Sequence, residues 1–143
     1  MTKVLMVCLG NICRSPLAEG ILKHKLKNTN IEVASAGTAA YHTGNAPDKR
    51  SVAVAAANGI DISGQRAAKF NLADFDTYSH IFVMDQSNYK DIISKARNKK
   101  DISKVALLLD KDNVPDPYYG DLSDFEHVYN LIDIACNKIL KIL

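Results

Sequence analysis

Hydrophobic positions along this chain fall into two kinds of pattern, short continuous runs and helical repeats. The short runs are typical of buried strands and cover residues 3–7, 31–36, 80–84 and 105–108. Apolar residues at three- and four-residue spacing predict helices over residues 15–27, 47–58 and 86–96, and over a last segment after residue 123. Alternating strands and helices favour a parallel sheet that is covered on both faces.

The pattern therefore predicts one α/β domain over residues 1–143, a four-stranded parallel sheet with helices on both faces. This is a three-layer, flavodoxin-like or Rossmann-like arrangement, whose ligands bind beyond the carboxyl ends of the strands. Two helix starts are expected as well. Ser15 is predicted to cap the first helix, with Pro16 in its first turn, and the Ser123-x-x-Glu126 pattern predicts a capping box for the last.

The densest chemical signal lies between the first strand and the first helix, in the run Cys8-Leu9-Gly10-Asn11-Ile12-Cys13-Arg14-Ser15-Pro16. A tight loop between strand and helix can turn its backbone N–H groups toward one point, where the positive end of the helix adds to them. Gly10 and Asn11 are residues that tolerate unusual backbone angles. The run thus predicts a phosphate-binding loop with a thiol at its floor.

Cys8 and Arg14 have complementary roles in this prediction. The planar guanidinium of Arg14 can bind two phosphate oxygens at once. Converging amides, the helix end and Arg14 all favour the thiolate of Cys8 over its thiol. That thiolate would attack phosphorus and form a phosphocysteine, which water would then hydrolyse.

Composition changes this picture little. The chain is 47% hydrophobic and 24% charged with a formal net charge of +2, so no broad basic surface for nucleic acid is indicated. No apolar stretch is long enough to span a membrane, and the N-terminus lacks the pattern of a signal peptide. The three cysteines make no disulfide framework, so a reducing cytoplasm is the expected location.

We expect no metal and no cofactor. The four histidines are interpreted as surface or core residues, since they have no metal-ligand spacing: His24, His42, His80 and His127. Arg14 and the loop amides can supply the charge neutralisation that phosphoryl transfer often takes from a metal.

Four motifs, in this order, resemble the low-molecular-weight protein tyrosine phosphatases over essentially the whole chain. They are Cys8 to Pro16, Ser35-Ala36-Gly37-Thr38, Met84-Asp85 and Asp116-Pro117-Tyr118-Tyr119. The resemblance implies hydrolysis of phosphotyrosine in proteins. It also implies binding of inorganic phosphate or other oxyanions in the loop, by Leu9, Gly10, Asn11, Ile12, Cys13, Arg14 and Ser15.

The resemblance implies roles for residues outside the loop. Asp116, held between two prolines, would be the general acid and later the base. Tyr118 and Tyr119 would wall the entrance, with Tyr41 matching the opposite wall. In the supporting shell, Ser35 would bond Asn11 and Asp85 would be a buried acid near the loop.

Three further expectations follow from the resemblance. Ser15 would stabilise the thiolate of Cys8, and Cys13 would form a reversible disulfide with Cys8 that protects it from oxidation. Many family members have a histidine that braces the loop asparagine. Its counterpart here is Gln65.

Other functions within and beyond this fold stay open at this point. A protein-arginine phosphatase is less favoured because Ile12 and the tyrosine pair differ from those relatives. A thiol-coupled arsenate reductase needs a cysteine pair that residues 60–100 lack. A non-catalytic phosphate-binding module would not need Cys8, and a phosphocysteine carrier would not need Arg14 with Asp116. The expected state is a monomer or weak dimer.

Overall fold

The computed structural model describes residues 2–143 and contains one parallel sheet. Its strands are β1 (Lys3–Cys8), β2 (Glu32–Gly37), β3 (His80–Val83) and β4 (Val105–Leu107). They lie in the order β2-β1-β3-β4, and each neighbouring pair is parallel. The predicted four-stranded parallel sheet is confirmed.

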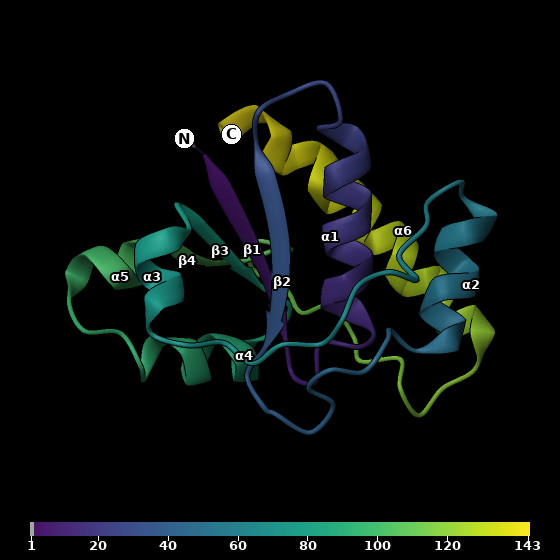
Figure 1. Cartoon of the computed structure of the whole chain (residues 1–143), viewed down its shortest axis with the longest axis horizontal. Helices are drawn as coiled ribbons and strands as arrows, with labels where there is room; N and C mark the ends of the chain where they lie inside the picture. Colours follow the sequence, from purple (N-terminus) through teal and green to yellow (C-terminus); the bar gives the residue numbers. More distant parts are fainter. Residues whose placement is uncertain (1) are drawn as a thin grey trace.

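Helices cover both faces of the sheet. They are α1 (Arg14–Lys25), α2 (Lys49–Ala57), α3 (Ala73–Thr77), α4 (Gln86–Ile93), α5 (Lys99–Ser103) and α6 (Leu122–Ile139), followed by the 3-10 turn η1 (Leu140–Ile142). Figure 1 shows α1, α2 and α6 on one side of the strands and α3, α4 and α5 on the other. The sequence pattern missed α3 and α5, because a five-residue helix is too short to show a helical period.

The core divides into two clusters because successive side chains of a strand point to opposite faces. Val4 and Met6 of β1 pack with residues of α1 and α6, whereas Leu5 and Val7 pack with residues of α3 and α4. Every one of these four strand residues is buried. Because both faces of this strand are buried at these positions, every one of them is apolar, which explains the continuous apolar run in the sequence.

The start of α1 differs from its prediction. Cys13 occupies the N-cap position and makes no side-chain capping bond. Ser15 lies one residue inside the helix, so the prediction that it caps α1 is wrong. Its hydroxyl is instead used by the loop before the helix, where it bonds Asn11 and lies beside Cys8.

The start of α6 also differs. The helix begins at Leu122, and Asp121 is the N-cap, with a capping box that it shares with Asp124. The Asp121 carboxylate accepts hydrogen bonds from the backbone N–H groups of Ser123 and Asp124. The prediction of a box from Ser123 to Glu126 is therefore wrong by two residues, because an aspartate two positions earlier is an equally good cap.

No helix within residues 2–143 has both the length and the apolar character needed to cross a lipid bilayer.

The contrast between two isoleucines on α6 gives a stability test. Ile132 is fully buried in the core, whereas Ile134 is 56% exposed. We expect Ile132→Ala to lower the free energy of unfolding by about 2–5 kcal/mol, because it leaves a cavity, and Ile134→Ala to change it by under about 0.5 kcal/mol. Urea unfolding followed by circular dichroism measures both. Equal losses would mean that α6 does not pack as described.

Candidate active site

Backbone carbonyls in and beside the loop between β1 and α1, residues 9–13, bond to the surrounding protein. The carbonyl oxygens of Cys8, Leu9 and Ile12 accept hydrogen bonds from backbone N–H groups of residues 38, 39 and 48, at 2.9, 3.0 and 2.8 Å. Within residues 2–143, the N–H groups of residues 9–13 donate to no protein acceptor. The loop therefore turns its carbonyls outward and leaves its donors available, as an anion-binding nest requires.

Asn11 fixes this loop through both its backbone and its side chain. Its φ of 58° lies in the left-handed region that asparagine tolerates better than most residues. Its Nδ2 donates to Ser15 Oγ at 2.7 Å and to Ser35 Oγ at 2.9 Å. Its Oδ1 accepts from the backbone N–H of Ala68 at 3.0 Å. The side chain is buried and fully bonded, so it holds the loop against β2 and the segment at Ala68.

A chain of polar contacts continues from Asn11 to a buried carboxylate. Ser35 Oγ donates to Glu19 Oε1 at 2.7 Å, and Lys23 Nζ donates to Glu19 Oε2 at 2.7 Å. Glu19 is only 7% exposed. A buried charge is tolerated when it is paired and hydrogen-bonded, as Glu19 is here. Because the Ser35 hydroxyl donates to this carboxylate, the Ser35 oxygen is oriented to accept from Asn11.

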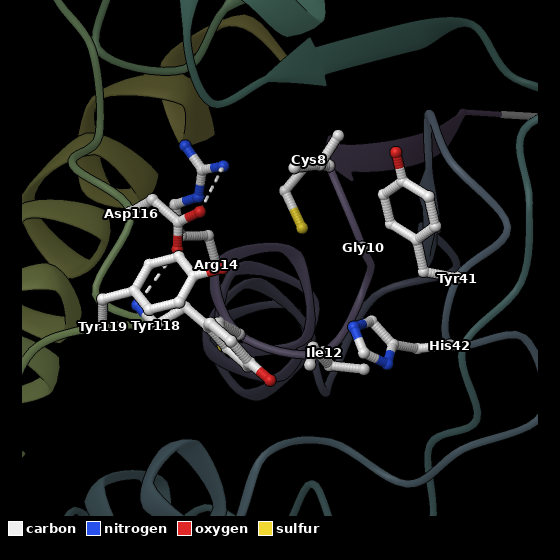
Figure 2. Close-up of a pocket in the computed structure, with 11 residues that line it drawn as sticks. Cys8, Gly10, Ile12, Arg14, Tyr41, His42, Asp116, Tyr118 and Tyr119 are labelled. Carbon is white, nitrogen blue, oxygen red and sulfur yellow. Dashed lines mark hydrogen bonds and ion pairs between the residues drawn. The ribbon is translucent and has the colours of Figure 1, made fainter.

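Cys8 lies at the floor of the loop with its sulfur pointing into the enclosed space (Figure 2). Its Sγ is 2.9 Å from Ser15 Oγ, which is hydrogen-bonding distance. The backbone of Cys8 is held in the sheet opposite Gly37. A side chain at Gly37 would collide with backbone atoms of Leu9 and Gly10, so the loop passes directly over this glycine.

Arg14, the first residue of α1, is a buried cation with two kinds of partner. Its Nη1 donates to Asp85 Oδ2 at 2.7 Å and to the Val114 carbonyl at 3.0 Å. Its Nη2 lies 3.8 Å from Asp116 Oδ2. Asp85 is itself fixed, because its other oxygen caps α4 by accepting from the N–H of Asn88. One end of the guanidinium is thus part of the framework, and the other faces Asp116.

A cavity of about 150 Å³ opens above Cys8 and Arg14. Asp116, Tyr118 and Tyr119 lie on one side, and Tyr41 and His42 on the other (Figure 2). The remaining lining residues come from the loop: Leu9, Gly10, Ile12 and Cys13. The walls are aromatic, and the floor carries the sulfur and the guanidinium.

The cavity brings together most of the predicted site residues from three separate segments. Ser35 bonds Asn11 and Asp85 bonds Arg14 behind the loop, and Asp85, expected as a buried acid, is half-buried. Within residues 2–143, no group of three or more histidine, cysteine or acidic side chains is placed to hold a metal ion.

Comparison of the sequence with known proteins identifies the family of this chain. A profile of the family described as "Low molecular weight phosphotyrosine protein phosphatase" matches residues 3–143. The chain belongs to this phosphatase family. It is 39% identical over 148 residues to the low molecular weight phosphotyrosine protein phosphatase of Homo sapiens, an alignment that covers 96% of this chain and 93% of the human protein.

Solved structures of this phosphatase family are similar as well. A protein tyrosine phosphatase from Entamoeba histolytica aligns with a TM-score of 0.93 at 33% identity, covering 99% of this chain and 97% of that one. Wzb from Vibrio vulnificus, solved in complex with benzylphosphonate, aligns with a TM-score of 0.91 at 32% identity, covering 99% of both chains. The fold described above is the fold of these phosphatases.

The structure places two residues whose roles the sequence left open. Gln65 does not brace Asn11, because its Nε2 donates to the Pro16 carbonyl at 3.1 Å, while the Ala68 N–H donates to the Asn11 oxygen. His42, expected as a surface or core residue, is half-buried and lines the cavity next to Tyr118, with the ring centroids 6.3 Å apart.

Other residues of the site were missed by sequence reasoning. Glu19 lies in a helix segment that is buried on all sides, so its spacing gives no signal. Asp48 and Arg50 contact the two loops that form the cavity, and the only available signal was that Asp48 directly precedes a helix.

The left-handed backbone of Asn11 gives a matched pair of variants. Asn11→Ala and Asn11→Gly both lose the three side-chain hydrogen bonds, but only glycine adopts a positive φ without steric cost. We expect Asn11→Gly to be more stable than Asn11→Ala by about 1 kcal/mol, measured as the difference in free energy of unfolding. The reverse order would show that position 11 is not left-handed in solution.

The three thiols of this phosphatase differ in their surroundings, which predicts selective labelling. Burial, reinforced by the negative charge of Asp48, raises the pKa of Cys13 to about 12, and burial raises the pKa of Cys136 to about 12. Both thiols are therefore protonated and unreactive at pH 7. We expect iodoacetamide to label Cys8 first, as read by peptide mass mapping.

The Cys8→Ser variant is the control for this labelling, and it should lose the fast reaction while Cys13 and Cys136 stay unlabelled. If Cys13 or Cys136 in the folded protein were modified as fast as Cys8, the thiol environments described above would be wrong.

Proposed function

We propose that this protein hydrolyses phosphotyrosine in proteins, and small aryl phosphates, through a phosphocysteine on Cys8. The observation that carries the proposal is the loop itself, whose N–H groups have no protein acceptor within residues 2–143 and whose first neighbour, Cys8, points its sulfur into the cavity. Membership of the phosphatase family supports the same reaction class.

In the proposed first step, the phosphoryl group lies in the loop, bound by its N–H groups and by Arg14. The Cys8 thiolate attacks phosphorus, and the bond between phosphorus and the aryl oxygen breaks. The Asp116 carboxyl, protonated at this stage, donates its proton to the leaving phenolate oxygen. Its place across from the Arg14 guanidinium, at the mouth of the cavity, supports this role.

In the second step, water attacks the phosphorus of the phosphocysteine. Asp116, now ionised, takes a proton from this water, and the bond between sulfur and phosphorus breaks. Inorganic phosphate leaves, and the negative charge returns to the Cys8 sulfur, where the Ser15 hydroxyl at 2.9 Å can donate to it.

Aromatic side chains at the entrance support an aryl substrate. Tyr41 and Tyr119 are largely exposed at the mouth of the cavity, and Tyr118 stands between Tyr119 and His42. Such walls suit the planar ring of phosphotyrosine. Wzb, which shares this fold, was solved with benzylphosphonate, a compound that also joins an aromatic ring to a tetrahedral phosphorus.

The reversible Cys8–Cys13 disulfide stays part of the proposal, as does the cytoplasmic location that keeps these thiols reduced. All three cysteines are free in this structure. Cys13 is the last residue of the loop that begins after Cys8, at the N-cap of α1, and both cysteines line the same cavity.

Hydrolysis of p-nitrophenyl phosphate tests the assigned roles. We expect Cys8→Ser to have no turnover, because the nucleophile is lost, and Asp116→Ala to lose about 10²–10⁴-fold in kcat. Mass spectrometry of a rapidly quenched Asp116→Ala reaction should find phosphate on the peptide containing Cys8. Normal hydrolysis by Cys8→Ser would refute covalent catalysis.

The pH dependence of the wild-type rate is a further test. The acid must be protonated and the nucleophile ionised, so kcat/KM should follow a bell-shaped profile with a mildly acidic optimum. The acidic-side rise depends on the nucleophile, and the basic-side fall depends on Asp116. A profile in Asp116→Ala that keeps the basic-side fall would exclude Asp116 as the acid.

A further inference from the structure

The segment that carries Asp116, residues 114–120, has no regular secondary structure, so its position depends on contacts at its two ends. At its start, the Val114 N–H donates to the Met84 carbonyl at 2.7 Å, and the Val114 carbonyl accepts from Arg14. At its far end, the carbonyls of Tyr118 and Gly120 accept from Arg50. Asp116 lies between these two anchors.

Arg50 holds the far end with both terminal nitrogens. Its Nη2 donates to the Tyr118 carbonyl at 2.9 Å, and its Nη1 donates to the Gly120 carbonyl at 2.9 Å. These two carbonyls are 68 and 70 residues away along the chain. A planar guanidinium can bond two carbonyls in fixed directions, whereas the single ammonium of a lysine cannot.

Arg50 is itself fixed by its neighbours. Its Nε and Nη2 each donate to one oxygen of Asp48 at 3.0 Å. Its guanidinium lies over the ring of Phe125, 4.3 Å from the centroid, and Phe125 is fully buried. The Arg50 side chain is thus held in one place although it is partly exposed.

Asp48 joins this arrangement to the phosphate-binding loop. Its backbone N–H donates to the Ile12 carbonyl at 2.8 Å, and its carboxylate both caps α2 and receives the Arg50 guanidinium. The hydrogen bonds from Arg50 lower the pKa of Asp48, which favours the ionised form of this carboxyl. One continuous set of bonds therefore runs from Ile12 through Asp48 and Arg50 to Tyr118 and Gly120.

We propose that Arg50 is a positioning residue: it sets the distance between the Asp116 carboxyl and the loop that holds the phosphoryl group. The inference rests on the proposed function, in which Asp116 donates the proton to the leaving group. Arg50 does not itself line the cavity, and the one lining residue that it bonds is Tyr118, in the segment that carries Asp116, so its effect on the reaction passes through this segment.

Proton donation is sensitive to such positioning. A general acid must lie within about 2.6–3.2 Å of the atom that receives its proton, and a misplacement of about 1 Å can cost about 10²-fold in rate. The Arg50–Asp48 pair is partly exposed, with 35% and 13% of the side-chain areas accessible, and water weakens such pairs, so they add little to stability. We therefore expect loss of Arg50 to affect the acid step far more than the fold.

The leaving group distinguishes an acid defect from a general one. Phenol is a much weaker acid than p-nitrophenol, so hydrolysis of phenyl phosphate depends more on proton donation. We expect Arg50→Met to lower kcat/KM for phenyl phosphate by about tenfold or more, a part of the general acid's whole contribution, and to lower it clearly less for p-nitrophenyl phosphate. Equal losses for both substrates, or none, would overturn the inference.

A double-variant comparison tests whether Arg50 acts through Asp116. In the Asp116→Asn background the acid is already absent, so adding Arg50→Met should change kcat/KM for phenyl phosphate by less than about twofold. A further loss as large as in the wild-type background would mean that Arg50 acts independently of the acid, and the inference would be wrong.

Arg97 is the matched control. It also pairs with two carboxylates, Asp76 at 2.7 Å and Asp101 at 2.8 Å, and its guanidinium lies 5.8 Å from the centroid of the Phe75 ring. These contacts lie among α3 and α5, on the other side of the sheet from α2 (Figure 1). Arg97→Met should leave the ratio of the two kcat/KM values unchanged. If Arg97→Met changed this ratio as much as Arg50→Met does, the effect of Arg50 would be a general structural one.

The conservative variant Arg50→Lys keeps the charge and carries the same test if Arg50→Met fails to fold. The lysine ammonium lacks the planar fork, so it cannot bond both carbonyls and both Asp48 oxygens in the directions that Arg50 uses, and the loss with phenyl phosphate should be smaller than for Arg50→Met but still selective.

Failure of the proposed function would look different. If Asp116→Asn showed no selective loss with phenyl phosphate, the acid assignment would fall. If Asp116→Asn showed this selective loss and both Arg50 variants did not, only the positioning role of Arg50 would be wrong.

Discussion

The direction of the peptide groups in one five-residue loop is the constraint on which the rest of the structure depends. The Leu9 and Ile12 carbonyls bond to the segment after β2 and to Asp48, and within residues 2–143 the loop N–H groups donate to no protein acceptor. Asn11 makes this possible, because its left-handed backbone reverses the chain while its side chain bonds three neighbours. The proposed anion site thus depends on backbone geometry, and the surrounding segments hold the loop in place.

Some buried charged groups hold the site together, and others face the cavity. Arg14 gives one nitrogen to Asp85 and the Val114 carbonyl, while its other nitrogen faces Asp116 at the cavity. Glu19 is bonded by Ser35 and Lys23 and has no contact with the cavity. Removing one partner of such a set leaves an unpaired buried charge, which costs far more than the pair contributes. The site therefore tolerates few changes among these residues.

Burial and contacts between elements explain why the strands were predicted correctly and the starts of α1 and α6 were not. The strands were recognised because both faces of β1 and β3 are buried, which produces continuous apolar runs. The two helix starts were misplaced for a related reason. Several polar residues near each start are competent caps, and the one used depends on contacts beyond the helix, as Ser15 shows by bonding Asn11 instead.

The sequence by itself determined the four strands, the longer helices and the candidate anion loop, because buried strands and long helices have clear hydrophobic patterns and residues 8–15 are neighbours in the chain, so their geometry is local. Only the tertiary structure decided which distant groups support that loop. Ala68 reaches Asn11 across 57 residues, and Val114 reaches Arg14 across 100. Hydrophobic patterns report burial and period, but they do not report which side chains meet where the carboxyl ends of the parallel strands come together. For this reason the parts played by Asp48, Arg50 and His42 emerged from the folded chain alone.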